Sequence, residues 1–274
     1  MALKGNLLFN GDLETGDLTG WELQPFGKPQ QYTATVTADA KLCGNYGLKL
    51  SSDVDTAIGY IGYDKICSFD EYEGYLFIFP CKLVEGYYNL GILYGMDDKG
   101  NLIDDYWVGY NNEKGEWRVI KAILRGFGDI THFKVGGFFY GTYNTDIFYI
   151  DEVKLMPLRS LKGHILTEYK SFDNVTTTTE WYPTISCIGR CRLVSVVRTE
   201  DVKGTDPSLD VCIEIGLFDN TSTYITKWQA DITTAKVTMS EWDLPEVCWI
   251  KVRYNISGTD ASFDIYHHLR IEPY

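Results

Sequence analysis

Residues 6–21 read NLLFNGDLETGDLTGW, and this segment says more about the fold than any other. An apolar run is followed by the pair Asn10-Gly11, by acidic residues and by a second glycine turn, and the segment ends at Trp21. Asn-Gly is a strong turn signal because both residues tolerate a positive φ angle. A tryptophan directly after such turns is expected to fill the core where the chain re-enters a sheet. The segment therefore predicts a strand, a looped return and a sheet.

Runs with the character of strands recur along the rest of the chain. They are rich in β-branched and aromatic residues, are bounded by turn residues, and several alternate with a period of two. Strands are expected at residues 31–37, 47–50, 75–79, 117–124, 133–140, 147–156, 192–198, 209–217, 224–230 and 247–256. No amphipathic helix longer than two turns is predicted. The fold class is therefore all-β.

A domain boundary is expected at Met156-Pro157-Leu158, between a closing strand and the short basic segment 159–163. The chain then forms two β-sandwich domains, residues 1–157 and 158–274. The second contains an internal echo, since GTDPSLD at 204–210 is matched by GTDASFD at 258–264. We interpret the two copies as similar turns that open strands, because two copies do not make a repeat array.

Charge and cysteine content exclude several classes of protein. The formal net charge is -13 and the pI is about 4.7, so no nucleic-acid partner is expected. No signal-peptide core and no stretch of membrane-spanning length is present, which predicts neither secretory export nor a membrane partner. The seven cysteines lie beside apolar residues and are expected to be buried free thiols in a chain folded in a reducing cytosol. Zinc at Cys187 and Cys191 is not expected, because no second cysteine pair exists.

Residues 5–157 resemble the carbohydrate-binding modules of the family 4/9/16/22 type. The segment 6–21 is similar to the opening of these modules, 43–50 to their glycine-then-strand element, 117–120 to their tryptophan strand, and 148–155 to their closing strand. The resemblance implies that the first domain is a jelly roll. Order and spacing of four segments support the fold more than they support sugar binding.

The resemblance also implies a structural calcium ion that joins the first turn to the last strand. Glu14 and Asp151 would supply carboxylate oxygens, Lys49 a backbone carbonyl, and Asp12 a further carboxylate. Calcium binds six to eight oxygen ligands, and such a site would clamp the two ends of the sandwich. The alternative is that Glu14 and Asp151 are ordinary turn and strand-end acids.

A sugar site needs aromatic rings that lie against pyranose faces. The candidate residues are Trp107, Tyr110, Tyr140 and Tyr143. The alternative is that these rings belong to the core or to ordinary surface, as most rings must in a chain with 15% aromatic residues. Four acids between Asp97 and Asp105 indicate a solvated loop rather than a cation site. No catalytic motif or carboxylate pair is recognisable, so an enzyme is not expected.

Residues 204–214 and 250–259 resemble a β-sandwich module of bacteriophage virion proteins. Together with the missing signal peptide, the predicted free cysteines and the two-domain layout, this resemblance predicts a non-catalytic virion structural or accessory protein (decoration, fibre or tail-associated). Such a protein would be made in the host cytoplasm and would be present on the virion as a homo-oligomer or in many copies, beside other virion proteins. Its first domain would bind host surface polysaccharide. The rival hypothesis is an extracellular polysaccharide-binding protein of a cellular glycan-degrading system. A third is a purely structural assembly protein.

Overall fold

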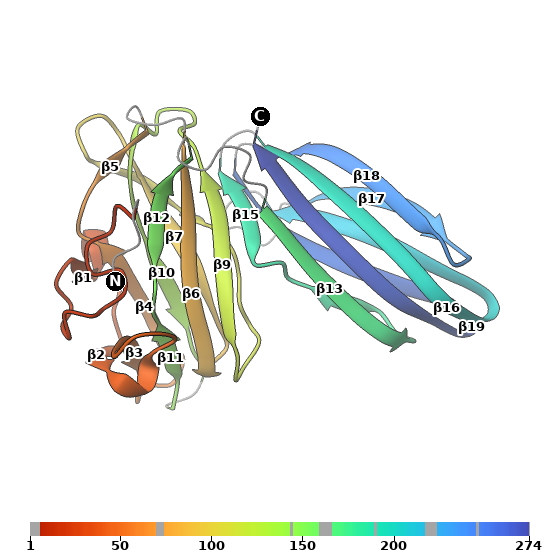
Figure 1. The fold of residues 1–274 in the computed structure, drawn as a ribbon, viewed down its shortest axis with the longest axis horizontal. Coiled ribbons are helices and arrows are strands. Elements are labelled where there is room, and N and C mark those ends of the chain that lie inside the picture. The colour runs from red at the N-terminus through yellow and green to blue at the C-terminus, as the bar shows by residue number, and fades with distance from the viewer. Residues whose placement is uncertain are drawn as a thin grey trace. The chain divides into compact units, whose positions relative to one another are not determined.

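The computed structural model describes residues 6–69, 74–142, 145–158, 166–188, 191–216, 224–244 and 247–273. These residues are almost entirely strands and connecting turns, with two short 3-10 helices, η1 (Pro25–Gly27) and η2 (Ala38–Ala40). The chain divides into two compact units, Met1–Gly163 and His164–Tyr274. The fold is therefore all-β, as predicted (Figure 1). Within the described ranges, no helix has the length and apolar character needed to cross a membrane.

Unit 1 is a sandwich of two antiparallel sheets. Sheet A has the order β1 (Trp21–Leu23), β4 (Ile58–Tyr63), β10 (His132–Tyr140), β7 (Tyr88–Met96) and β8 (Leu102–Trp107), and β5 (Cys67–Ser68) also pairs with β10. Sheet B of this unit has the order β9 (Trp117–Leu124), β6 (Tyr75–Glu85), β11 (Ile147–Ile150), β3 (Gly47–Ser51) and β2 (Thr33–Thr37), and β12 (Lys154–Pro157) pairs with β6.

The core of unit 1 lies between these sheets and depends on glycines in sheet A. Phe77 and Phe79 of β6 are fully buried. A Cβ atom on Gly91 would lie 3.0 Å from the Phe77 ring, and one on Gly137 would lie 2.5 Å from the Phe79 ring. Glycine at both positions therefore lets the phenylalanines of sheet B pack directly on the backbone of sheet A. Each fully buried phenylalanine contributes roughly 1.5–3 kcal/mol.

Unit 2 is organised around two long antiparallel strands, β16 (Cys191–Gly216) and β19 (Val247–Pro273), which run beside each other in Figure 1. The first part of β16 also pairs with β18 (Val237–Leu244), and its last part pairs with β17 (Tyr224–Ile232). Along the other side of β19 lie β13 (Leu166–Val175), β14 (Thr179–Trp181) and β15 (Ile185–Ile188). The core contains alternating side chains of both long strands, including Leu193, Val197, Ile213, Val252, Phe263 and Leu269.

The internal echo lies in the middle of these two strands, so the interpretation as strand-opening turns is wrong. Thr205 pairs with Thr259, and the register shifts on both sides of this pair. Gly204 has φ +104 and Gly258 has φ +113, and a Cβ atom on either would lie within 2.7 Å of a carbonyl oxygen of the opposite strand. The repeated sequence therefore marks paired β-bulges, where each strand bends and changes its neighbour.

Two of the cysteines whose side chains the structure describes differ from the prediction of buried free thiols. Cys67, Cys81 and Cys212 are buried thiols outside disulfide bonds, and burial raises the pKa of the Cys81 thiol to about 12. Cys43 is free but exposed, because its segment lies on the surface. Cys191 is disulfide-bonded, so a free thiol there was the wrong prediction. The side chains of Cys187 and Cys248 lie outside the described residues.

Candidate functional site: an aromatic face on sheet A

The face of sheet A that is turned away from sheet B carries a cluster of aromatic rings. Gly91 and Gly137 face the core, so their neighbours along β7 and β10 face the opposite side of the sheet. Leu90, Ile92 and Phe138 form a buried floor there. Half-buried aromatic rings pack against this floor around Phe138. We call the surface that they form the aromatic face, and its rings are those of Tyr60, Tyr88, Trp107, Tyr110 and Tyr140.

Strand register explains why these rings meet. Tyr88 of β7 lies opposite Tyr140 of β10, and Leu90 lies opposite Phe138. Phe138 in turn lies opposite Tyr60 of β4. On the other side, Ile92 of β7 pairs with Trp107 of β8. The alternation of each strand therefore places one or two aromatic residues on the same face, and pairing joins them across four strands.

Tyr88 is the centre of the ring contacts. Its ring centroid lies 5.1 Å from that of Tyr110 at an interplanar angle of 29°, and 5.3 Å from that of Tyr140 at 32°. Trp107 is nearly parallel to Phe138, with centroids 6.1 Å apart and an angle of 17°. Tyr60 approaches Phe138 at 4.7 Å. These contacts hold the rings in fixed orientations, so a flat ligand would meet a prearranged surface.

Three of the four residues predicted for sugar binding, Trp107, Tyr110 and Tyr140, lie together in this cluster. The fourth, Tyr143, lies outside the described residues. Sequence reasoning missed Tyr60, Tyr88 and Phe138. The alternation of aromatic and aliphatic residues at 88, 90, 92 and 94 was a usable signal, but it could not show which face of the strand was outward.

A short segment crosses the same face of sheet A beside the rings. We call residues 24–30, which contain η1, the strap. Pro25 of the strap packs on the backbone of Gly62 in β4, where a Cβ atom would lie 3.0 Å from its ring. Phe26 contacts Tyr94 of β7, with centroids 5.7 Å apart. The strap explains why Tyr94 has no exposed surface although it lies on the outward face, and this burial raises its pKa well above the ordinary value.

Two ion pairs lie near the strap, one between the strap and β8 and the other between two strands of sheet A. Lys28 Nζ lies 2.5 Å from Asp105 Oδ1 of β8 and 5.4 Å from the centre of the Tyr60 ring. Lys134 Nζ of β10 lies 2.8 Å from Glu22 Oε2 of β1 and 5.2 Å from the centre of the Phe26 ring. The first pair therefore reaches β8 beside the rings, and the second lies under Phe26.

Only the first part of the acidic stretch 97–105 forms a turn. Asp104 and Asp105 belong to β8, so the prediction of a solvated loop is wrong for these two residues. The Asp97 carboxylate accepts hydrogen bonds from the backbone N–H groups of Lys99 and Asn101 at 2.9 and 2.8 Å, and from the Asn101 side chain at 2.9 Å. The Asn101 bonds lower the pKa of Asp97. Its oxygens are engaged in shaping the turn.

Glu14 and Asp151, the two main residues predicted for calcium, both bind the surface segment 42–46. Asp151 Oδ2 accepts hydrogen bonds from the N–H groups of Leu42 and Cys43 at 2.7 and 3.0 Å. Glu14 Oε1 accepts hydrogen bonds from the N–H groups of Asn45 and Tyr46 at 2.6 and 3.0 Å. The structure thus brings the two acids to one segment and joins the beginning of unit 1 to its last strands.

The two carboxylates differ in their environment. The Glu14 carboxylate is accessible, and the N–H groups of Tyr46 and Asn45 lower its pKa. Asp151 has no exposed surface, and burial raises its pKa to about 6 although the N–H groups of Cys43 and Leu42 oppose the shift. Asp151 is therefore a buried acid that is satisfied by backbone donors.

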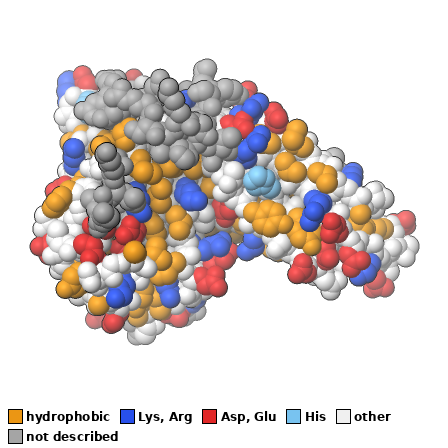
Figure 2. Space-filling model, in the orientation of Figure 1, with side chains coloured by type: hydrophobic (Ala, Val, Ile, Leu, Met, Phe, Trp, Pro, Cys, Tyr) orange, Lys and Arg blue, Asp and Glu red, His pale blue; other side chains and the backbone are white. Residues whose placement is uncertain are grey.

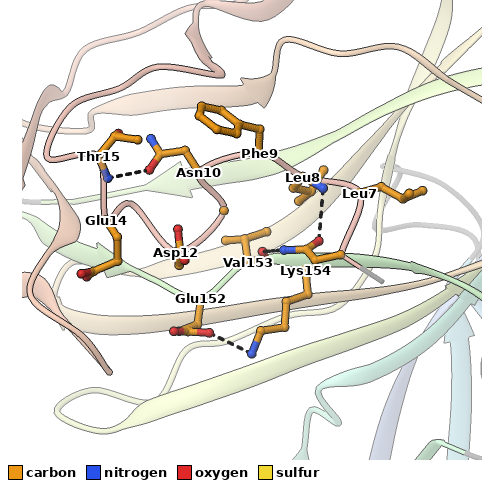
Figure 3. Close-up of a pocket in the computed structure, with 12 residues that line it drawn as sticks. Leu7, Leu8, Phe9, Asn10, Asp12, Glu14, Thr15, Glu152, Val153 and Lys154 are labelled. Carbon is orange, nitrogen blue, oxygen red and sulfur yellow. Dashed lines mark hydrogen bonds and ion pairs between the residues drawn. The ribbon is translucent and has the colours of Figure 1, made fainter. Parts of the chain in front are cut away.

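The other two predicted ligands lie in different surroundings. Lys49 is in the middle of β3, between Thr35 of β2 and Tyr149 of β11, so its backbone belongs to the sheet ladder. Asp12 lines a cavity of about 500 Å³ together with Glu14 and Glu152. Figure 3 shows this cavity, and Glu152 there pairs with Lys154 at 2.9 Å.

The side chains predicted to bind calcium are not arranged as a calcium coordination site. Among the described residues, no three His, Cys, Asp or Glu side chains are gathered as metal ligands would be. The oxygens of Glu14 and Asp151 face N–H donors, whereas calcium requires six to eight oxygen ligands around one point. Calcium binding therefore stays a prediction.

No protein-family model and no curated protein matches the chain. Solved structures are similar to it. The tandem of two family 22 carbohydrate-binding modules from Paenibacillus barcinonensis Xyn10C is 11% identical over 99% of this chain and 98% of its own, with a TM-score of 0.40. A family 61 module in complex with β-1,4-galactotriose is 16% identical over 56% of this chain and 99% of its own, with a TM-score of 0.43.

The enzymatically active domain of tailspike protein 4 from bacteriophage CBA120 is also similar, at 15% identity and a TM-score of 0.41. It aligns with 56% of this chain and with 21% of its own length. Modules of families 16 and 22, which the sequence resemblance named, are among the similar structures. At these identities and TM-scores the likeness concerns fold at most, and we derive function from the residues of this chain.

Proposed function

We propose that the protein binds a polysaccharide chain on the aromatic face of sheet A, without catalysing a reaction on it. The observation that carries this proposal is the cluster around Tyr88, in which half-buried rings are held by their neighbours above an apolar floor. Half-buried rings on a sheet face offer flat apolar area to the C–H faces of sugars. Rings that are already fixed lose little conformational entropy when a ligand binds.

The shape of the surface favours an extended ligand. The rings run across β4, β10, β7 and β8, from Tyr60 at one end to Trp107 at the other. Neighbouring strands are about 4.8 Å apart, so the row covers roughly 14 Å. Lys28 of the strap lies at one side of this row. A sugar chain laid across the strands would stack on the rings and hydrogen-bond along that side.

Binding is tested by affinity electrophoresis on a panel of soluble polysaccharides, followed by calorimetry with the oligosaccharide of the best one. Tyr88→Ala and Trp107→Ala should each weaken binding at least about tenfold, because each removes a stacking surface. Tyr169→Ala is the control, since Tyr169 is a 58% exposed ring in unit 2. Folding of each variant is checked by circular dichroism. Wild-type protein that binds no member of the panel would refute the proposal.

For the biological setting, we propose a virion structural or accessory protein whose ligand is host surface polysaccharide. The supporting sequence features are residues 204–214 and 250–259, which resemble a module of phage virion proteins and form parts of β16 and β19. Many copies on one particle would turn weak binding by each copy into firm attachment. An electron-microscopy map of the native particle tests this setting and shows whether the aromatic face is exposed or packed against neighbours.

The rival setting is a polysaccharide-binding protein of a cellular glycan-degrading system. It predicts a neighbouring glycoside hydrolase gene, whereas the virion setting predicts a neighbouring terminase, portal or capsid gene. Glycan binding is common to both settings, so this comparison tests the setting alone. Particle assembly without glycan binding would instead indicate a purely structural role.

A further inference from the structure

The ion pair between Lys28 and Asp105 lies at the border of the aromatic face. Asp105 is two residues before Trp107 in β8, so both side chains are on the same side of the strand. Lys28 comes from the strap and lies over the Tyr60 ring. The pair therefore joins the strap beside Tyr60, at one end of the row, to β8, which carries Trp107 at the other end. Its side chains are 27% and 11% exposed, which leaves them within reach of a ligand.

Lys28 of the strap and Lys134 of β10 are each already paired with a carboxylate. Lys28 pairs with Asp105 at 2.5 Å, and Lys134 pairs with Glu22 at 2.8 Å. A ligand carboxylate or sulfate that approached Lys28 would have to displace Asp105 and leave a partly buried acid without its cation. The chain as a whole carries a formal net charge of -13, which adds a general repulsion of anions. Figure 2 shows acidic and basic side chains interspersed on the visible surface.

We propose that the Lys28–Asp105 pair determines the charge selectivity of the aromatic face. Asp105 neutralises Lys28, so Lys28 serves as a hydrogen-bond donor to sugar hydroxyls and does not attract anions. The face then accepts uncharged sugar units and rejects uronic acids and sulfated sugars. This inference rests on the glycan binding proposed above. It states that two residues, Lys28 and Asp105, distinguish uncharged from anionic sugars.

The test compares Asp105→Asn with wild type in calorimetric titrations against a neutral oligosaccharide and against an oligogalacturonate of the same length. The neutral ligand is the one found in the polysaccharide panel. Asparagine keeps the size of the side chain and can still accept a hydrogen bond from Lys28. It carries no negative charge, however, so the positive charge of Lys28 is no longer neutralised. Affinity of Asp105→Asn for the oligogalacturonate should rise about tenfold, because a charged hydrogen bond becomes available. Affinity for the neutral ligand should change less than about threefold.

Glu22→Gln is the matched control. It removes the carboxylate partner of Lys134 in the same way, but Lys134 belongs to β10 and lies against Phe26 rather than against Tyr60. This variant should leave both affinities as in wild type. A double variant, Lys28→Gln with Asp105→Asn, should abolish the gain.

The outcomes separate the two proposals. Wild-type protein that binds oligogalacturonate as tightly as the neutral ligand overturns the selectivity while the binding function stands. The selectivity is also overturned if Asp105→Asn gains nothing, or if Glu22→Gln gains as much. Wild-type protein that binds neither ligand overturns the proposed function itself. A rise confined to Asp105→Asn and lost in the double variant supports the inference.

Discussion

Replacing His267 by glutamine should remove the part of the acid sensitivity of unit 2 that comes from this side chain, about 3 kcal/mol between pH 7 and pH 4. His267 of β19 has no exposed surface, and its Nε2 and Nδ1 atoms lie 2.7 Å from Ser195 Oγ and 2.7 Å from the Tyr254 hydroxyl. The Trp181 ring lies edge-on to it, with centroids 5.2 Å apart. Burial, with a smaller contribution from His268, lowers the pKa of His267 from 6.5 to about 3. The folded protein therefore holds this ring neutral.

The sign of the effect follows from the two states. Below pH 6.5 the unfolded chain binds a proton that the folded chain does not take up until about pH 3. Stability is consequently lost as the pH falls through this window and is regained as it rises. Between pH 7 and pH 4 the loss due to His267 alone is about 3 kcal/mol.

The assay is urea unfolding at pH 7 and pH 4 for wild type, His267→Gln and His268→Gln, with hydrogen exchange of β16 and β19 peptides to report on unit 2. The free-energy difference between wild type and His267→Gln should change by about 3 kcal/mol between the two pH values. His268 is the control, because it is the next residue but only half-buried, and its variant should follow wild type. If His267→Gln loses as much stability as wild type on acidification, the reasoning is wrong.

Further predictions concern packing and metal binding. Gly137→Ala should destabilise unit 1 by about 1–3 kcal/mol in thermal unfolding, because the new methyl group would overlap the Phe79 ring; unchanged stability would contradict the packing described. Gly204→Ala should lower the stability of unit 2 by at least about 1 kcal/mol, since φ is +104 and the opposite strand is in contact; an Ala variant as stable as wild type would show that the bulge relaxes. If calcium binds at Glu14 and Asp151, adding it should raise the melting temperature of unit 1 and EDTA should reverse the rise; equal melting temperatures in both would refute calcium binding.

The sequence predicted part of the aromatic face for a clear reason. Trp107 and Tyr110 stand close together in the chain, and Tyr140 occurs beside glycine in a second aromatic run, so each was visible as a local cluster. Two strands, β5 and β6, separate Tyr60 from Tyr88 in the sequence. Only the pairing of β4 with β10 and of β10 with β7 brings the two residues to the same surface. Local pattern therefore identified candidates, and long-range register selected the site.

The acids of unit 1 illustrate the same limit. The resemblance pointed to Glu14 and Asp151 as partners, and the structure does bring both to the segment 42–46. The sequence resemblance could not indicate that backbone N–H groups point at the oxygens of these two acids. Strand periodicity does not predict the conformation of a surface segment such as 42–46. Likewise, the sequence around Lys49 predicted a strand but did not show that the backbone of this residue, in the middle of β3, pairs with neighbouring strands.

By itself, the sequence determined that this protein is all-β, because alternation and turn residues act locally and fix the state of each segment. Its acidic net charge also leads us to expect no nucleic-acid partner. Only the tertiary structure decided that the repeated GTD sequences are bulges, that the strap covers Tyr94, and that Lys28 meets Asp105. These features depend on which strands become neighbours, and pairing between distant segments is set by the packing of the whole unit.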